Sequence, residues 1–277
     1  MDKPFITVVM PVFNAERFLK EAIEGVLAQT YPNFELIIID DVSKDRSWEI
    51  IRKYQEKDRR VKAYQNAQNL KIAKTREKGL SLAEKKAKYY AVADADDISL
   101  PERFEKEVAF LEREKGCAVC GSQIYIIDEN SRKKGLRRYP VSDKELKSKI
   151  ILFDPIAQPA AMIRIEALSK VGGYDEKFTG IPCEDYDLWL RIGKDWQMFN
   201  IDDFLLEYRV TSSQSKTTHL KKVLWHTIRL QLKWMFFKPY FNILAFPNVL
   251  AELALFLLPS KTVLRLFKKI RLQKSGN

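Results

Sequence analysis

The sequence predicts an α/β fold, with a mostly parallel sheet that carries helices on both faces. Two observations lead to this prediction. Short apolar runs rich in β-branched residues alternate with segments in which apolar residues recur at helical spacing, and the connections between them are short. In such sheets ligands bind beyond the carboxyl ends of the strands, so we expect the functional site there.

The first half of the chain is expected to supply four strands and three helices. The expected strands cover residues 5–10, 34–39, 61–64 and 89–93. The expected helices cover residues 16–29, 47–54 and 72–87. Pro11 should end the first strand, and Asp45 or Ser47 should cap the second helix, because both side chains can accept a hydrogen bond from an unpaired backbone N–H.

The second half continues with a helix over residues 102–114, strand residues at 117–121 and 124–127, a short helix from Glu166 and a helix that buries Leu188 and Trp189. Cys117 and Cys120 have zinc-like spacing, but the chain offers no second Cys or His pair, so buried strand positions are expected. The basic run 132–138 predicts a solvated hairpin or loop, with contact to an anionic acceptor as the alternative. The apolar stretch 155–163 suits the wall of a pocket.

Acidic residues follow two of the predicted strands. Asp40 and Asp41 come after the second strand, and Asp94, Asp96 and Asp97 after the fourth. Loops at strand ends are often polar, but two acidic ends in one sheet favour a site. Three carboxylates within four residues repel one another unless a cation compensates, which leads to the hypothesis that they hold a divalent metal and, through it, a diphosphate.

A second acidic cluster, Glu184-Asp185-Tyr186-Asp187, opens a later helix. Carboxylates in the first turn are favoured by the helix dipole, so these residues fit simple amino-terminal capping. They also fit a positioned carboxylate base. The sequence alone leaves both interpretations open.

The composition is that of a folded protein, with 46% hydrophobic and 31% charged residues in 277 positions. The amino terminus leads directly into a strand, and the chain has three cysteines, so we expect a reducing cytoplasm and no disulfide framework. The net charge of +11 is localised. Residues 1–215 carry 36 basic and 36 acidic side chains, whereas residues 216–277 carry twelve basic side chains and one acid, Glu252.

We therefore divide the chain into a catalytic domain, residues 1–215, and a carboxy-terminal helical segment, residues 216–277. The stretch between Pro239 and Pro259 is mostly apolar but interrupted, and it is marginal for a membrane span. We expect it to lie in the interface of an anionic membrane. The alternative is a helical pair packed on the catalytic domain or on a partner in a homodimer.

Four motifs appear in order: Val8 to Asn14, Ile38-Ile39-Asp40-Asp41-Val42-Ser43, Asp94-Ala95-Asp96-Asp97 with Pro101, and Glu184-Asp185-Tyr186-Asp187-Leu188-Trp189. Each motif is weak alone, but their order and separation are specific. Over about residues 5–210 the chain resembles the family 2 glycosyltransferases, which are inverting, nucleotide-sugar-dependent enzymes. The resemblance implies the GT-A fold, the nucleotide-diphospho-sugar transferase fold, with a Rossmann-like sheet.

The resemblance also implies roles for individual residues. Asp96 would bind the metal, Mn²⁺ or Mg²⁺, and Asp94 would contact the ribose or the metal shell, while Asp97 would orient the loop or cap the following helix. Asp185 would be the base that activates the acceptor hydroxyl, with Glu184 as the fallback and Asp187 structural. The nucleotide-sugar would contact Pro11, Val12, Phe13, Glu16, Asp41, Arg76, Asp94 and Ala95, with Lys71 as a second candidate beside the diphosphate.

The chain departs from two patterns found among relatives. It lacks the Gln-x-x-Arg-Trp motif of processive polysaccharide synthases, since Lys233 precedes Trp234, and this favours transfer of a single sugar. No His closely follows Tyr208-Arg209, and we do not count the distant His219 as a metal ligand.

The resulting interpretation is an inverting glycosyltransferase that uses a nucleotide-sugar donor, with a UDP- or dTDP-sugar favoured because Asp41 would accept a hydrogen bond from the N3–H of uracil or thymine. Its acceptor would be a glycan or lipid-linked molecule of cell-surface polysaccharide biosynthesis, at the inner face of the cell membrane. The alternative is a catalytically inactive nucleotide-binding or scaffold protein of the same fold. Nucleic-acid binding is disfavoured because the catalytic half is neutral and the aromatic residues of the tail lie in apolar runs.

Overall fold

The structure, a computed structural model, describes residues 3–211, 220–243, 245–259 and 263. The strands are β1 Phe5–Val12, β2 Phe34–Asp40, β3 Val61–Gln65, β4 Ala87–Val92, β5 Ile98–Ser99, β6 Cys117–Ile127, β7 Lys133–Arg137, β8 Met162–Arg164 and β9 Gln197–Arg209. The α-helices are α1 Leu19–Leu27, α2 Ser47–Lys57, α3 Lys71–Ser81, α4 Arg103–Arg113, α5 Asp143–Lys149, α6 Ile165–Val171, α7 Glu184–Asp195, α9 Leu220–Trp234 and α10 Ala245–Leu257.

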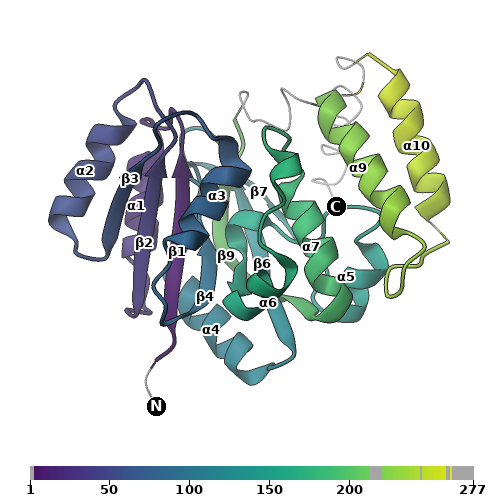
Figure 1. Cartoon of the computed structure of the whole chain (residues 1–277), viewed down its shortest axis with the longest axis horizontal. Helices are drawn as coiled ribbons and strands as arrows, with labels where there is room; N and C mark the ends of the chain where they lie inside the picture. The colour runs from purple at the N-terminus through teal and green to yellow at the C-terminus, as the bar shows by residue number, and fades with distance from the viewer. Residues whose placement is uncertain (1–2, 212–219, 244, 260–262, 264–277) are drawn as a thin grey trace.

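One sheet forms the centre of the molecule, in the order β3-β2-β1-β4-β8-β6-β9-β5, with β7 paired to β6 outside this path. The first four strands in this order are parallel, as are β6 and β9, while β8 runs antiparallel between β4 and β6. The predicted mostly parallel sheet is confirmed. The carboxyl ends of β1, β2 and β4 therefore meet at one edge, opposite the edge from which the N terminus emerges (Figure 1).

Both faces of the sheet are buried, which explains the uninterrupted apolar runs. Along β1, Val8 and Met10 face one core cluster, to which α1 and α4 contribute, and Val9 faces the other, to which α6 and α7 contribute. Successive side chains of a strand point to opposite faces, so a strand between two helical layers must be apolar at every position. The same packing makes the strand ends rigid supports for the loops that follow.

Several boundaries differ from the sequence prediction. Pro11 lies inside β1, because β4 pairs with β1 only up to Val9 and a strand with one partner tolerates a missing N–H. The first helix begins at Leu19, since residue 16 is tied into a loop. The third ends at Ser81, where the N–H of Glu84 donates to buried Glu35 and holds a turn.

Other local predictions are confirmed. Cys117 and Cys120 are buried in β6, and neither belongs to a cluster of potential metal ligands among the described residues. The basic run 132–138 contains the exposed strand β7, which forms an antiparallel hairpin with β6.

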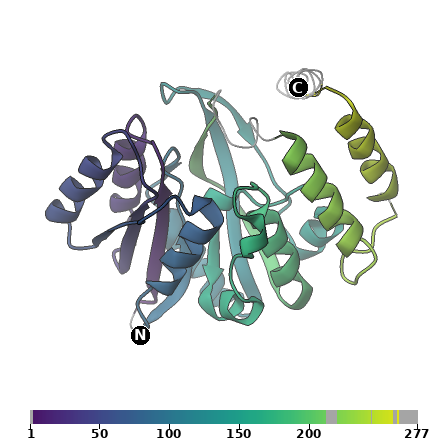
Figure 2. The same cartoon turned by 45° about the horizontal axis from the view of Figure 1, so that its top comes forward.

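Helices α9 and α10 form an antiparallel pair at the side of the catalytic domain (Figures 1 and 2). Trp234, Met235 and Tyr240 belong to the same core cluster as α7, and the Tyr240 hydroxyl donates to the carbonyl oxygen of Leu190 at 2.8 Å. In the described parts of the chain, every helix is too short or too polar to cross a membrane. The domain boundary at residue 215 stays a prediction, and His219 lies outside the described residues.

We predict that Gly79→Ala destabilises the protein, because α3 packs closely on β1 at this position. A Cβ on Gly79 would lie 2.3 Å from Cγ1 of Val9. Overpacking of this kind costs about 1–3 kcal/mol, against a gain of at most about 1 kcal/mol in helix propensity. Urea unfolding measures the difference. Gly135→Ala on β7, where a Cβ meets nothing within 4 Å, is the matched control. Equal stability of the two variants would contradict the packing account.

Candidate active site

The loops that follow β1 and β2 are joined to each other by hydrogen bonds. The N–H of Asn14 donates to the Ser43 hydroxyl at 2.9 Å, and the N–H of Glu16 donates to Asp45 at 3.0 Å. In return, the N–H of Arg46 donates to the Glu16 carboxylate at 2.9 Å. Asp45 also accepts from the N–H of Ser47 at the start of α2, but the N-cap position itself is held by Arg46 and has no side-chain cap hydrogen bond, so the predicted cap by Asp45 or Ser47 is wrong in its position. The two loops thus form one preformed support at the strand ends.

A partly exposed aromatic ring follows β1 next to these loops. Pro11 and Val12 are buried at the end of β1, while the side chain of Phe13 is 50% exposed. The ammonium group of Lys71 lies 6.0 Å from the centre of the Phe13 ring. An exposed ring beside a cation at a strand end suits the stacking of a planar base and the approach of an anionic group.

Asp41 has a structural task. Its carboxylate accepts hydrogen bonds from the side-chain amide of Asn66 at 2.7 Å and from the backbone N–H groups of Leu70 and Lys71 at 2.7 and 2.9 Å. Asp41 therefore fixes the segment between β3 and α3. A carboxylate has about four acceptor sites, so these contacts leave capacity for one further donor.

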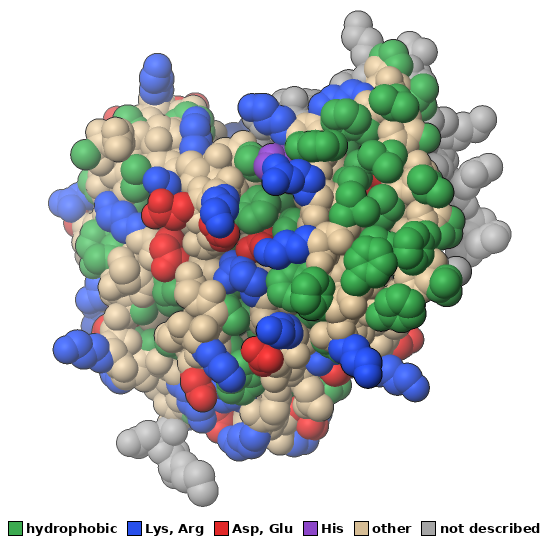
Figure 3. Space-filling view, turned by 45° about the vertical axis from the view of Figure 1, so that its right-hand side comes forward, with side chains coloured by type: hydrophobic (Ala, Val, Ile, Leu, Met, Phe, Trp, Pro, Cys, Tyr) green, Lys and Arg blue, Asp and Glu red, His purple; other side chains and the backbone are tan. Residues whose placement is uncertain are grey.

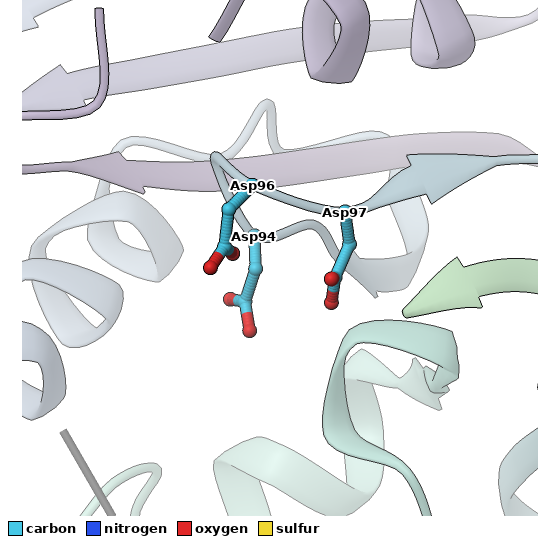
Figure 4. A group of neighbouring side chains, drawn as sticks. All are labelled: Asp94, Asp96 and Asp97. Carbon is cyan, nitrogen blue, oxygen red and sulfur yellow. The ribbon is translucent and has the colours of Figure 1, made fainter. Parts of the chain in front are cut away.

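The loop after β4 carries the acidic cluster shown in Figure 4. One oxygen each from Asp94, Asp96 and Asp97 lie within 4.8 Å of one another. Burial and the neighbouring Asp94 raise the pKa of Asp96 to about 6, and burial and the charges of Asp96 and Asp94 raise the pKa of Asp97 well above its usual range. The buried Oδ2 of Asp97 has no hydrogen-bond partner among the described residues. A divalent cation would relieve this repulsion, and oxygen-only ligands fit Mg²⁺ or Mn²⁺.

Arg209 at the end of β9 holds this loop in place. Its N–H donates to Oδ1 of Asp97 at 2.8 Å, and its Nε donates to the carbonyl oxygen of Asp96 at 2.8 Å. Its remaining nitrogens reach Glu21 on α1 and the turn between β6 and β7. Asp97 therefore orients the loop, one of its two expected roles, and it does not cap α4, which begins at Arg103.

The two acidic clusters of the sequence meet at Arg76. This side chain is fully buried on α3, and its guanidinium donates to Asp94 at 2.6 Å and to Glu184 at 2.8 Å. It also donates to the amide oxygen of Gln158 at 2.5 Å. Arg76 thus bridges the proposed metal ligands and the proposed base region, since Asp94 stands 18 residues from it in sequence and Glu184 stands 108 residues from it. Contact with a diphosphate, its expected role, stays a prediction.

Glu184 and Asp185 begin α7, and both side chains are buried. Glu184 is turned to Arg76, whereas Oδ1 of Asp185 accepts from the N–H of Tyr186 at 2.8 Å. Asp187 forms an ion pair with Arg191 at 2.7 Å, consistent with the structural role expected of it. A carboxylate at a helix amino terminus is stabilised as a charge, which is the form that a base requires.

A family model described as Glycosyl transferase family 2 matches residues 7–172, which is more than half of the chain. The chain belongs to glycosyl transferase family 2. Similar members include an uncharacterized glycosyltransferase of Methanocaldococcus jannaschii, 36% identical over 80% of this chain and 76% of the relative. Another is the O-antigen biosynthesis glycosyltransferase WbnJ of Escherichia coli, 33% identical over 78% of this chain and 83% of the relative.

Solved structures show the same GT-A fold. S. aureus TarS 1–349 in complex with UDP-GlcNAc has a TM-score of 0.68 and 20% identity, and the match covers 83% of this chain and 66% of TarS 1–349. The mannosyltransferase PcManGT of Pyrobaculum calidifontis, in complex with GDP-Man and Mn²⁺, has a TM-score of 0.64 and 15% identity over 98% and 81% of the two chains. The predicted family and fold are confirmed, and the chain is a glycosyltransferase by family.

The sequence analysis did not identify three residues that hold other side chains of the site in place. Gln158, Arg209 and Asn66 hold Arg76, the acidic loop and Asp41, respectively. Gln158 lies in the stretch predicted to line a pocket, and Arg209 lies in the Tyr-Arg pair, but no local pattern gave their partners.

We predict that Arg76→Met strongly destabilises the protein. Removing the guanidinium leaves the buried Glu184 and the partly buried Asp94 without their shared cation. Breaking a buried ion pair from one side costs about 3–5 kcal/mol. Guanidinium unfolding measures the loss, with Arg17→Met as the control, because Arg17 pairs with Glu129 on the surface and should contribute about 1 kcal/mol or less. Similar losses in both variants would show that the bridge is unimportant.

Proposed function

We propose that this protein is an inverting, metal-dependent glycosyltransferase that moves one sugar from a UDP- or dTDP-sugar to a hydroxyl of a glycan or lipid-linked acceptor in surface polysaccharide biosynthesis. The main support is the Asp94–Arg76–Glu184 bridge, which joins the carboxylates suited to the donor's metal to the start of α7, where the base candidate lies. WbnJ supports polysaccharide biosynthesis and TarS with UDP-GlcNAc supports a uridine donor, whereas PcManGT binds GDP-Man.

The donor would bind along the edge formed by β1, β2 and β4. Phe13 would face the base, Asp41 would use its remaining acceptor capacity for a base N–H, and Glu16 would reach the ribose. Asp96 and Asp94 would hold the divalent metal beside the diphosphate. When bound, such a metal supplies Lewis-acid stabilisation of the leaving diphosphate.

The acceptor would approach from the α7 side. Asp185 would remove the proton of the acceptor hydroxyl as its oxygen attacks the anomeric carbon from the face opposite the nucleotide. A single displacement of this kind inverts the anomeric configuration. Glu184, held by Arg76, would keep the start of α7 at a fixed distance from the acidic loop, so that the sugar lies between the two.

We predict that Asp96→Asn weakens Mn²⁺ binding by at least about tenfold, because the variant removes a charged ligand. Isothermal titration in the presence of UDP measures the affinity, and donor hydrolysis or transfer should fall with it. Asp203→Asn, an exposed carboxylate on β9, is the control. Full metal-dependent activity in Asp96→Asn would reject the metal assignment. Metal-dependent donor binding without any turnover in the unaltered protein would favour the inactive nucleotide-binding alternative.

We predict that Asp185→Asn keeps donor affinity and lowers transfer by about 10²–10⁴-fold, the usual contribution of a general base. Donor binding is followed by thermal stabilisation with Mn²⁺, and transfer by release of the nucleoside diphosphate. Asp195→Asn, an exposed carboxylate at the other end of α7, should leave both unchanged. Unchanged turnover in Asp185→Asn would move the role of base to Glu184 or elsewhere.

We also place the protein in the cytoplasm, attached peripherally to the inner face of the membrane. The localised positive charge of residues 216–277 supports this proposal, because the cytoplasmic leaflet is anionic.

A further inference from the structure

The outer surface of α9, α10 and the segment between them carries large apolar side chains that no other part of the described chain covers. Six of them define what we call the tail surface: Trp225, Leu232, Phe236, Phe241, Phe246 and Leu250, with exposed fractions between 43% and 66%. Figure 3 shows apolar side chains gathered over this part of the molecule, with basic side chains around them. The Phe236 ring, shortly after α9, and the Phe246 ring on α10 lie 5.8 Å apart, so the segment between the helices and α10 contribute to one continuous surface. Apolar patches of this kind mark interaction sites.

The exposed charged side chains among the described residues of 220–259 are all basic. Lys222, Arg229, Lys233 and Lys238 are exposed, and none of them forms an ion pair with an acidic residue of the described chain. Glu252, the single acid between residues 216 and 277, points inward between the helices, where it accepts hydrogen bonds from Gln231 and Asn248.

We propose that the tail surface lies on an anionic lipid membrane, with its aromatic and aliphatic side chains in the interface and the four cations at the headgroups. Apolar contact combined with positive charge is what such a surface binds. A two-fold dimer through the same patch would bring these cations against their own copies, so a second protein chain fits less well. The 15 residues of α9 and 13 of α10 are about 20 Å long, short of the bilayer core, so the pair lies along the surface.

The tail surface is connected to the proposed base. On the inner side of α9, His226 packs on Phe178 with the ring centres 6.0 Å apart, and the Cys183 thiol contacts the carbonyl oxygen of Val223 at 3.7 Å. Cys183 directly precedes Glu184 and Asp185. Docking would therefore hold the base side of the site near lipid, where a lipid-linked acceptor is found. This consequence rests on the proposed function, and the docking deepens the peripheral attachment proposed there by naming the face and the side chains that bind lipid.

The test is flotation of the full chain with vesicles, without donor or metal. We expect the protein to bind vesicles of about 70% phosphatidylcholine and about 30% phosphatidylglycerol. Added salt, or omission of the phosphatidylglycerol, should weaken this binding. The triple variant Lys222→Glu, Arg229→Glu, Lys233→Glu should bind more than about tenfold more weakly. The triple variant Lys53→Glu, Arg59→Glu, Lys62→Glu makes the same net charge change on exposed residues of α2, β3 and the turn between them, and it should bind as the unaltered protein does.

Two further variants identify the face that docks. Leu250→Asp should abolish flotation, and Leu136→Asp on exposed β7 should not. Brominated phosphatidylcholine should quench Trp225, so quenching should be lost in Trp225→Phe and kept in Trp48→Phe. Unchanged circular dichroism and melting temperature establish that each variant is folded.

The proposal is overturned if the unaltered protein does not float, if both charge variants weaken binding equally, or if Leu250→Asp merely converts a dimer to a monomer in ultracentrifugation. Asp185→Asn separates this inference from the proposed function. If Asp185→Asn floats normally but does not transfer sugar, the result supports both the docking and the proposed function. If it floats normally and transfers sugar at the unaltered rate, only the assignment of Asp185 as the base is rejected.

Discussion

The arrangement of the site depends on one buried cation. The Arg76 guanidinium lies between Asp94 on the loop after β4 and Glu184 at the start of α7, and the Arg76 side chain is buried from solvent. Without it, carboxylates from both clusters would face one another in a region of low dielectric, where like charges repel strongly. A buried ion pair often adds little net stability, but it fixes geometry, since either partner alone would be costly. We therefore regard Arg76 as the residue that sets the distance between the donor side and the acceptor side.

The sheet explains why Arg76 can do this. Helix α3 crosses β1 so closely that Gly79 has no room for a Cβ, which fixes the helix that carries Arg76. The parallel strands β1, β2 and β4 end at one edge, and the loops there are held by hydrogen bonds within the protein: Ser43 to Asn14, Asp41 to Leu70, and Asp97 to Arg209. Preorganised loops of this kind reduce the reorganisation needed when charge develops in a reaction.

Features of the site that depend on neighbouring residues in the sequence could be predicted, whereas contacts between residues far apart in the sequence could not. Strand ends, the acidic run at Asp94 and the carboxylates before α7 are local patterns, so their positions could be predicted, as could the buried state of Cys117 and Cys120. The partners of Arg76 and Arg209 are different. Arg76 meets Gln158 across 82 positions, and Arg209 meets Asp97 across 112, contacts that exist only after β8 and β9 have joined the sheet. The helical tail followed from periodicity, but its docking through Tyr240 on α7 did not, because periodicity gives an apolar face without its partner.

The most direct test of the account is anomalous diffraction from crystals grown with Mn²⁺ and UDP. The account predicts a single strong peak within about 2.0–2.4 Å of a carboxylate oxygen of Asp96 and beside the diphosphate, with Arg76 still joined to Glu184. UDP bound at the strand ends without Mn²⁺ at Asp94, Asp96 or Asp97, or Arg76 released from Glu184, would contradict it.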